Sequence, residues 1–301
     1  MTDTAFPLDM VPTIQAAPQD YRLLQRVPLT RQDTTFPAAI NAPVGDEAPL
    51  VIVDVETTGL EAETDRIIEL GLVRASYSPS AKRLTTIHDA YSRYEDPGRP
   101  IPELITRITG ITDDDVAGRR IDDAWVGMMM AGDPLVLAHN APFDCGFLEA
   151  RFPAFDGQRW GCTASEIPWS ELGFESRKLE YLLLKHNSFY EGHRASIDCL
   201  ATAWLLALRP DGFAQLLDNV AQQTVVVRAF GAPFEVKDLL KARGYRWHPG
   251  DAGSNKCWWC EIPETSLAAE REFLDATYYQ GAERAAYEFR DARRRHRNAV
   301  A

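Results

Sequence analysis

The chain has 301 residues, of which 45% are hydrophobic and 25% are charged, and its formal net charge is −12. Such a chain can bury a sizeable core, and its acidic balance argues against a protein that coats nucleic acid along its whole surface. No window approaches the roughly 20 apolar residues of a membrane span, and the N-terminus lacks the features of a signal peptide. We therefore expect a cytoplasmic protein without a membrane partner.

Cysteine usage agrees with this expectation. The five cysteines are an odd number and are scattered through apparently regular segments, which favours buried thiols over a disulfide framework. The charge is uneven, because residues 222–301 hold 13 Lys and Arg against 11 Asp and Glu, so this part carries +2 and the rest −14. The C-terminal part is therefore the better place for a polyanion to touch.

The N-terminal 48 residues carry six prolines and no sustained hydrophobic period. They predict a Pro-rich, loosely ordered arm over 1–48. It is interpreted as a linker or a tail on the domain surface, with a specific docking motif as the alternative.

The pattern becomes regular from Leu50 onward. Three consecutive strands are followed by strands that alternate with helices, which indicates an α/β domain with a mixed sheet over 49–209. The predicted strands are 50–56, 66–76, 86–96, 134–140 and 159–165. The predicted helices include 103–110, 112–130, a segment after 142, 177–186 and 196–208.

A small module follows the Arg-Pro-Asp-Gly turn at 209–212. We predict a linker over 210–221 and an α+β accessory module over 222–280, with a strand, a helix, a hairpin and a second helix. The last segment, 281–301, predicts a basic helical tail, either a solvated helix end or an electrostatic contact for phosphates.

The first strand, read as LVIVDVETTGL, ends in two acids. Side chains at i and i+2 of a strand share a face, so Asp54 and Glu56 project together. Two adjacent buried carboxylates repel, and a divalent cation between them removes the cost. Oxygen-only ligands suit Mg²⁺ or Mn²⁺.

Two further acids are candidates for the same site. Asp144 falls in the opening turn of a helix after the strand LVLAHN, where Asn140 could cap and Pro142 stands in the first turn. Considered alone, Asp144 can instead be interpreted as an acid that is favourable at a helix N-terminus and has no role in metal binding. His193 and Asp198 point into one cleft if His193 lies in a loop and the helix begins near Ser196, whereas a lone loop histidine is usually a solvated surface residue.

This set of motifs resembles the DEDDh branch of the DnaQ-like 3′–5′ exonucleases. Asp54 and Glu56 match the first motif of that family, Asp144 the second, and His193 with Asp198 the third. The flanking texts ETTGL, DRIIELGLV and ITGIT match as well, and the resemblance covers 49–208. It implies an RNase H-like (exonuclease-type) mixed five-stranded sheet flanked by helices, joined here to a small α+β C-terminal domain.

The resemblance also implies a mechanism. Asp54, Glu56, Asp144 and Asp198 would hold two divalent cations, Mg²⁺ or Mn²⁺, and His193 would be the general base. The products would be nucleoside monophosphates from single-stranded 3′ ends, with DNA favoured over RNA. The implied substrate contacts are Thr57, Thr58, Gly59, Leu60, His139, Asn140 and Phe143. Leu60 and Phe143 could equally be core residues, and His139 with Asn140 could simply form a strand-end turn.

The accessory module allows two interpretations. Its tryptophans and neighbouring Arg and Lys residues form either a base-stacking platform or the core of a small domain. A zinc site at Cys257 and Cys260 is disfavoured, because no second ligand pair exists. The module keeps an alternative function open: a nucleic-acid-binding or polymerase-tethering subunit, with a polymerase or another protein as its partner.

Overall fold

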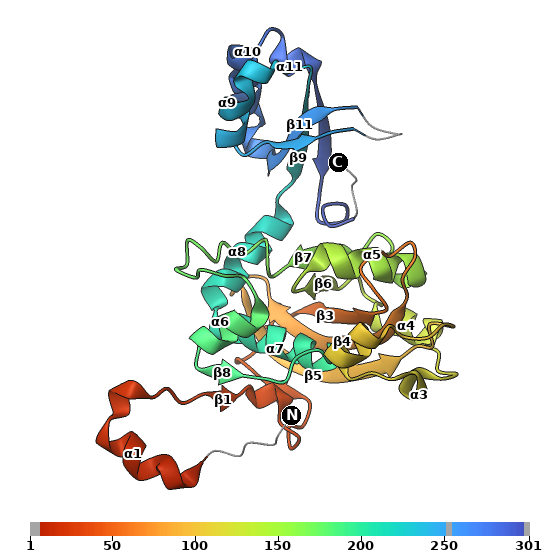
Figure 1. Cartoon of the computed structure of the whole chain (residues 1–301), viewed down its shortest axis with the longest axis vertical. Coiled ribbons are helices and arrows are strands. Elements are labelled where there is room, and N and C mark those ends of the chain that lie inside the picture. Colours follow the sequence, from red (N-terminus) through yellow and green to blue (C-terminus); the bar gives the residue numbers. More distant parts are fainter. Residues whose placement is uncertain (1–6, 251–254, 298–301) are drawn as a thin grey trace.

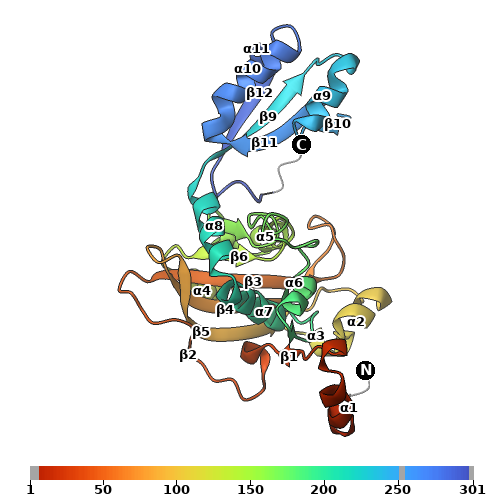
Figure 2. The same cartoon turned by 90° about the vertical axis from the view of Figure 1, so that its left-hand side faces the viewer.

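The computed structural model describes residues 7–250 and 255–297. A large α/β domain lies in the middle of the molecule, and helix α8 joins it to a small C-terminal module (Figure 1). The N-terminal arm lies at the end of the large domain away from that module (Figures 1 and 2). In the part of the chain that is described, no helix is long and apolar enough to cross a membrane.

The large domain is built on a six-stranded mixed sheet. Strands β3, β4 and β5 form an antiparallel meander, β6 pairs in parallel with β3, and β7 pairs in parallel with β6. The strands are β2 (Ala38–Ala39), β3 (Ala48–Thr57), β4 (Ile67–Ser78), β5 (Arg83–Tyr94), β6 (Leu135–Ala138) and β7 (Arg159–Cys162). All five predicted strands are present, and the sixth is β2, a two-residue edge strand too short to leave a periodic signal.

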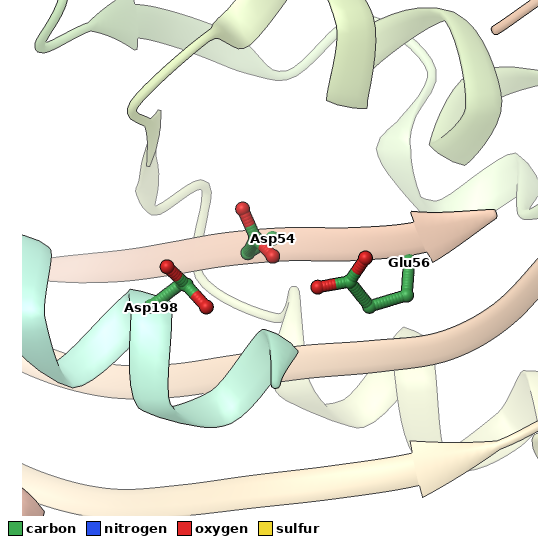
Figure 3. Close-up of side chains that lie close together, drawn as sticks. All are labelled: Asp54, Glu56 and Asp198. Atoms are coloured by element: carbon green, nitrogen blue, oxygen red, sulfur yellow. The ribbon is translucent and has the colours of Figure 1, made fainter. Parts of the chain in front are cut away.

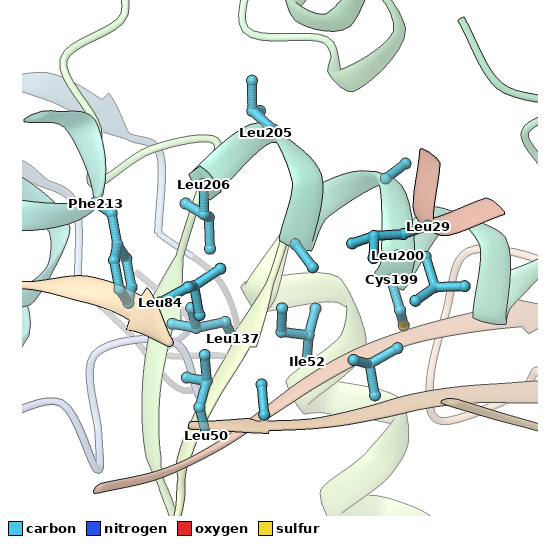
Figure 4. Packing of buried hydrophobic residues seen from close by; sticks show 14 of the residues in the cluster. Leu29, Leu50, Ile52, Leu84, Leu137, Cys199, Leu200, Leu205, Leu206 and Phe213 are labelled. Carbon is cyan, nitrogen blue, oxygen red and sulfur yellow. The ribbon is translucent and has the colours of Figure 1, made fainter. Parts of the chain in front are cut away.

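Helices cover both faces of this sheet. They are α2 (Glu103–Thr109), α3 (Asp113–Val116), α4 (Asp123–Met129), α5 (Ala141–Arg151), α6 (Leu179–Lys185) and α7 (Ala195–Leu208). Strand β3 is apolar on both faces: Leu50 and Ile52 belong to the same core cluster as α7, whereas Val51 and Val53 belong to that of α5. Figure 4 shows Leu50 and Ile52 facing the α7 side chains. A strand covered on both faces reads as a continuous apolar run, as the sequence of β3 does.

The arm is ordered over its second half, contrary to the loosely ordered arm predicted for 1–48. Strand β1 (Gln25–Arg26) pairs in parallel with β8 (Ser188–Phe189). Val27 is fully buried and Leu29 is 5% exposed, both in the cluster that contains α7. Two apolar side chains among prolines give no period, although they suffice to fix the segment on the domain. In the described part of the first half, residues 7–20, short turns of helix surround α1 (Val11–Ala16), and their residues are not buried.

The predicted linker over 210–221 is instead a helix, α8 (Pro210–Ala221). Phe213 and Leu216 on this helix are fully buried in the core of the large domain. A Cβ built on Gly161 of β7 would lie 3.2 Å from Leu216, so the helix packs directly on the sheet. The proline taken as a turn signal occupies the first helical turn, where its missing N–H costs nothing.

The C-terminal module is a four-stranded antiparallel sheet with helices, in the α+β class expected. Its elements are β9 (Thr224–Phe230), α9 (Lys237–Ala242), β10 (Arg246–His248), β11 (Cys257–Pro263), α10 (Leu267–Thr277), α11 (Gly281–Arg284) and β12 (Ala285–Arg290). The spatial order is β10-β11-β9-β12, the split βαβ arrangement. The helical tail predicted over 281–301 is wrong where it is described, because 285–290 form β12, which pairs with β9.

The basic residues after β12 return to the large domain. The carbonyl of Ala292 accepts a hydrogen bond from the Trp160 N–H on edge strand β7, at 2.9 Å. Arg293 binds both carboxylate oxygens of Asp133. Three further ion pairs join Arg295 to Glu166, and Arg297 to Glu149 and to Asp156. Arg293, Arg295 and Arg297 are thus not a solvated helix end, because each is paired with an acid of the large domain.

Candidate active site

Three acids from two elements converge at the centre of the large domain. Asp54 and Glu56 project from β3 and Asp198 from the first turn of α7, with one carboxylate oxygen of each within 4.8 Å of the others. Figure 3 shows the three carboxylates turned toward one another. The i, i+2 spacing on the strand therefore places Asp54 and Glu56 on one face, as the sequence predicted, and α7 covers that face.

Helix α7 reaches the strands because a glycine lies beneath it. Gly71 of β4 is paired with Asp54 in the sheet register. A Cβ at this position would lie 2.2 Å from the carbonyl carbon of Ala195, the first residue of α7. Any side chain here would push the helix outward and carry Asp198 away from Asp54.

Asp144 lies beside this cluster without belonging to it. It stands in the first turn of α5, is 2% exposed, and accepts a hydrogen bond from the Val55 N–H at 3.0 Å. Its charge is the strongest of the neighbouring charges acting on Asp54. The side chain of Asn140, by contrast, makes no capping hydrogen bond to α5.

His193 lies in the loop that precedes α7, as expected, and is exposed. Its backbone is left-handed, with φ of 65°, which is uncommon for a residue with a side chain. It is not in the group of three acids whose ligand atoms converge. The predicted helix start near Ser196 is one residue after the observed start at Ala195.

The acidic cluster is electrostatically unfavourable as it stands. Burial, followed by the charge of Asp144, raises the pKa of Asp54 well above its ordinary value. Burial and the charge of Asp198 raise the pKa of Glu56 to about 8. Burial also raises the pKa of Asp144 to about 8, against the opposing hydrogen bond from Val55. The carboxylates therefore hold protons that a cation can displace.

The donor set fits a divalent ion. Asp54, Glu56 and Asp198 offer only carboxylate oxygens, the donors that Mg²⁺ and Mn²⁺ prefer. Within the described residues, these three form the cluster whose ligand atoms are close enough to share one ion. A bound cation would offset the repulsion that raises these pKa values.

Three residues that support the cluster were missed by sequence reasoning. Glu69 is fully buried on β4, accepts hydrogen bonds from Ser92 and Arg194, and stands opposite Glu56 in the register. The Tyr190 hydroxyl donates to Asp198 at 3.1 Å, and the Arg194 N–H donates to its other oxygen at 3.2 Å. The one available signal was the acid inside the apolar run RIIELGLV.

The loop after β3 is stabilised by hydrogen bonds that its own threonine hydroxyls donate. Thr57 donates to the Gly59 carbonyl at 2.5 Å, and Thr58 donates to Asp65 at 2.9 Å. A Cβ on Gly59 would lie 2.4 Å from the Asp65 carboxylate, so the glycine has a packing role in this turn. Leu60 is 79% exposed, which excludes the core interpretation of this residue.

The remaining predicted contacts differ in their accessibility. His139 accepts from the Thr163 hydroxyl through Nδ1 and donates through Nε2 to the Arg177 carbonyl, each at 2.8 Å. Burial lowers its pKa to about 4, so it is a neutral strand-end residue whose two ring nitrogens are occupied. Asn140 is exposed, and Phe143 is half-buried with its ring 4.9 Å from that of Phe147.

The mixed sheet and this set of carboxylates together define a metal-dependent nuclease. The family model described as exonuclease, of RNase T type, matches residues 51–206, about half of the chain. The chain therefore belongs to the exonuclease family, and both the DnaQ-like resemblance and the RNase H-like fold that it implied are confirmed.

Bacterial polymerases are among the characterised relatives of this chain. The chain is 34% identical over 172 residues to the PolC-type DNA polymerase III of Listeria monocytogenes, and 34% identical over 190 residues to that of Bacillus subtilis. These matches cover 53% and 58% of this chain, and 11% and 12% of the polymerases. The chain thus spans about a tenth of the length of these relatives.

Similar solved structures include exonucleases bound to DNA and a 3′-exonuclease that recognises a histone mRNA stem-loop. An exonuclease X complex with 5′ overhanging duplex DNA is 25% identical with a TM-score of 0.43, covering 56% of this chain and 99% of that one. Escherichia coli exonuclease I with a dA16 oligonucleotide is 15% identical with a TM-score of 0.49, covering 79% and 73%. Both TM-scores are below 0.5.

Proposed function

We propose that the protein is a 3′–5′ exonuclease that releases nucleoside monophosphates from the 3′ ends of single-stranded DNA. The observation that carries this proposal is the convergence of Asp54, Glu56 and Asp198 within 4.8 Å in a chain of the exonuclease family. RNA is the second substrate class, since a contact to the 2′-hydroxyl decides between the two.

Four carboxylates are proposed to hold two divalent cations, Mg²⁺ or Mn²⁺. Asp54, Glu56 and Asp198 supply the convergent oxygens, and Asp144 lies next to Asp54 with one oxygen committed to the Val55 N–H. When bound, such ions activate a water and stabilise the leaving oxygen of an in-line displacement at phosphorus. The carboxylates must lose their protons first, which ties activity to pH.

His193 is proposed as the general base. An imidazole ring is the side chain best suited to take a proton from water at neutral pH. The exposed loop position gives it access to a bound 3′ end. Arg194, the next residue, makes two hydrogen bonds. Its side chain donates to Glu69, and its backbone N–H donates to Asp198, which fixes the C-terminal side of this loop.

The terminal nucleotide is proposed to lie beside the loop from Thr57 to Leu60. The exposed Leu60 and the half-buried Phe143 can pack against bases, and Asn140 is exposed nearby at the start of α5. The hydroxyls of Thr57 and Thr58 already have partners within the loop, so main-chain N–H groups are the contacts proposed for these residues.

Loss of activity in Asp54→Asn tests the proposal. The variant should release no nucleotide from single-stranded DNA with Mg²⁺ or Mn²⁺ while keeping its circular dichroism spectrum. Glu63→Gln, which removes an exposed acid outside the cluster, is the matched control. Residual cleavage by pure Asp54→Asn would refute the assignment of the site.

The alternative of a tethering subunit is decided by the same assay. A wild-type protein that binds single-stranded DNA and cleaves none of it would favour a nucleic-acid-binding or polymerase-tethering role. A polymerase or another protein is the partner class proposed for the parts of the chain outside residues 51–206.

A further inference from the structure

The sheet of the C-terminal module has one packed face and one open face. Val225, Val227 and Ala229 of β9 form a buried core with Leu240 of α9 and Leu274 of α10. Alternate residues of β9 point the other way; Thr224, Arg228 and Phe230 on this face are partly exposed, whereas Val226 is 2% exposed. Among the described residues of the module, neither α9 nor α10 contributes to the cover of this second face, because both helices pack on the first.

Aromatic and cationic side chains lie in rows across the open face. The strand register aligns Arg246 of β10 with Trp259 of β11 and Arg228 of β9. The Arg246 guanidinium lies 5.6 Å from the centre of the Trp259 ring. Phe230 of β9 lies in the neighbouring row of this face, where it is paired with Cys257 of β11. Both Trp259 and Phe230 are partly exposed.

The open face continues into a groove shared with the large domain. This groove has a volume of about 510 Å³. Its module side includes Arg246, Thr224, Glu261 and Pro263, and its other side includes Asn140, Pro142 and Arg177. Asn140 and Pro142 begin helix α5, which carries Asp144. The groove therefore leads from the beginning of the active-site helix to Arg246, whose guanidinium lies beside the Trp259 ring.

The charges along this path suit phosphates. Arg246 and Arg177 have no carboxylate partner among the described residues. The two acids that line the groove face Arg295, which pairs with Glu166 and lies 3.9 Å from Glu261. On the open face itself, Glu288 is paired with Arg228 at 2.8 Å. Arg246 and Arg177, which lack a carboxylate partner in the part of the chain that the structure describes, are therefore the charges that can meet a polyanion.

We propose that the groove and the open face bind the single-stranded DNA that trails from a 3′ end in the active site. Bases stack on Trp259 and Phe230, and phosphates meet Arg177 and Arg246. This inference rests on the proposed exonuclease function and adds a second binding surface outside the family domain. A four-stranded sheet with exposed aromatics is an established kind of platform for unpaired bases. The side chains present, rather than the fold, carry the inference.

The test measures DNA binding by full-length protein that carries Asp54→Asn to prevent cleavage. Fluorescence anisotropy is recorded with oligonucleotides of about 4 and about 20 nucleotides, since only the longer one spans both surfaces. Trp259→Leu should raise the Kd for the longer DNA at least about fivefold, and Trp259→Phe should restore much of the affinity. Trp247→Leu is the matched control, because Trp247 is 51% exposed and alternates onto the other face.

The phosphate contact has its own test. Arg246→Glu should weaken binding of the longer DNA and reduce the slope of log K against log salt by about 1. Lys241→Glu makes the same charge change on α9 and should leave that slope unchanged. Thermal melting of each variant confirms that the module is folded.

The inference is overturned if folded Trp259→Leu and Arg246→Glu bind the longer DNA as tightly as the parent protein. It is also overturned if only RNA of the same sequence depends on these residues. Cleavage assays with the unmodified active site keep this outcome separate from the proposed function. A wild type that cleaves nothing contradicts the proposed function, whereas the binding comparison still decides the platform.

Discussion

Replacing Glu56 by Gln should make the metal-free protein more stable while removing its activity. The folded protein raises the pKa of Glu56 from 4.5 to about 8, first through burial and then through Asp198. A difference of roughly 3.5 pH units corresponds to at most about 5 kcal/mol. The side chain is partly exposed and its neighbours share protons, so we expect about 1–2 kcal/mol. This gain equals a rise in melting temperature of about 3–6 °C.

The sign of the effect depends on pH in a defined way. Below the unfolded pKa of 4.5, wild-type Glu56 is protonated in both states, so the variant has no advantage. As pH rises to about 8, the wild type loses this contribution and the variant does not. Differential scanning calorimetry in EDTA across this range is the assay, with Glu63→Gln as the control. Equal melting temperatures for Glu56→Gln and wild type above pH 8 would refute the claim of repulsion.

Three further outcomes are expected. Affinity for Mg²⁺, measured by calorimetry, should increase from pH 6 to pH 8, because Glu56 and Asp144 both have pKa values near 8; a constant affinity would contradict this. Gly71→Ala should cost about 1–3 kcal/mol and weaken Mg²⁺ binding by displacing α7, whereas Gly127→Ala, in open space, should do neither. Arg295→Ala should cost about 1–3 kcal/mol, because it removes one partner of the buried Glu166 and leaves His296 and the Cys162 N–H as the others, whereas the exposed Arg294→Ala should cost little, as denaturant melts would show.

Local patterns predicted the large domain well. Alternation and turn residues located β3 to β7, and the spacing of Asp54 and Glu56 placed both on one face. The approach of Asp198 depends on Gly71, whose importance lies in a contact with Ala195 more than a hundred residues later. A pattern within one segment carries no information about such a contact.

The errors lie where tertiary contacts decide the structure. The linker and the arm were misjudged because Pro210 begins a helix and because Val27 is buried in spite of its proline-rich surroundings. Residues 285–290 of the predicted helical tail form strand β12, because they pair with the free edge of β9. Glu69 and Tyr190 were missed because their roles depend on contacts that no local pattern shows. Glu69 accepts a hydrogen bond from Arg194, which is far away in the sequence, and Tyr190 donates to Asp198 from the loop before α7.

The central claim is tested most directly by single-stranded DNA labelled at its 5′ end. With Mg²⁺, wild-type protein should shorten this DNA one nucleotide at a time into a ladder, and Asp54→Asn should leave it intact. Immediate release of the labelled nucleotide, or a ladder formed by both proteins, would contradict 3′–5′ cleavage at the Asp54, Glu56 and Asp198 cluster.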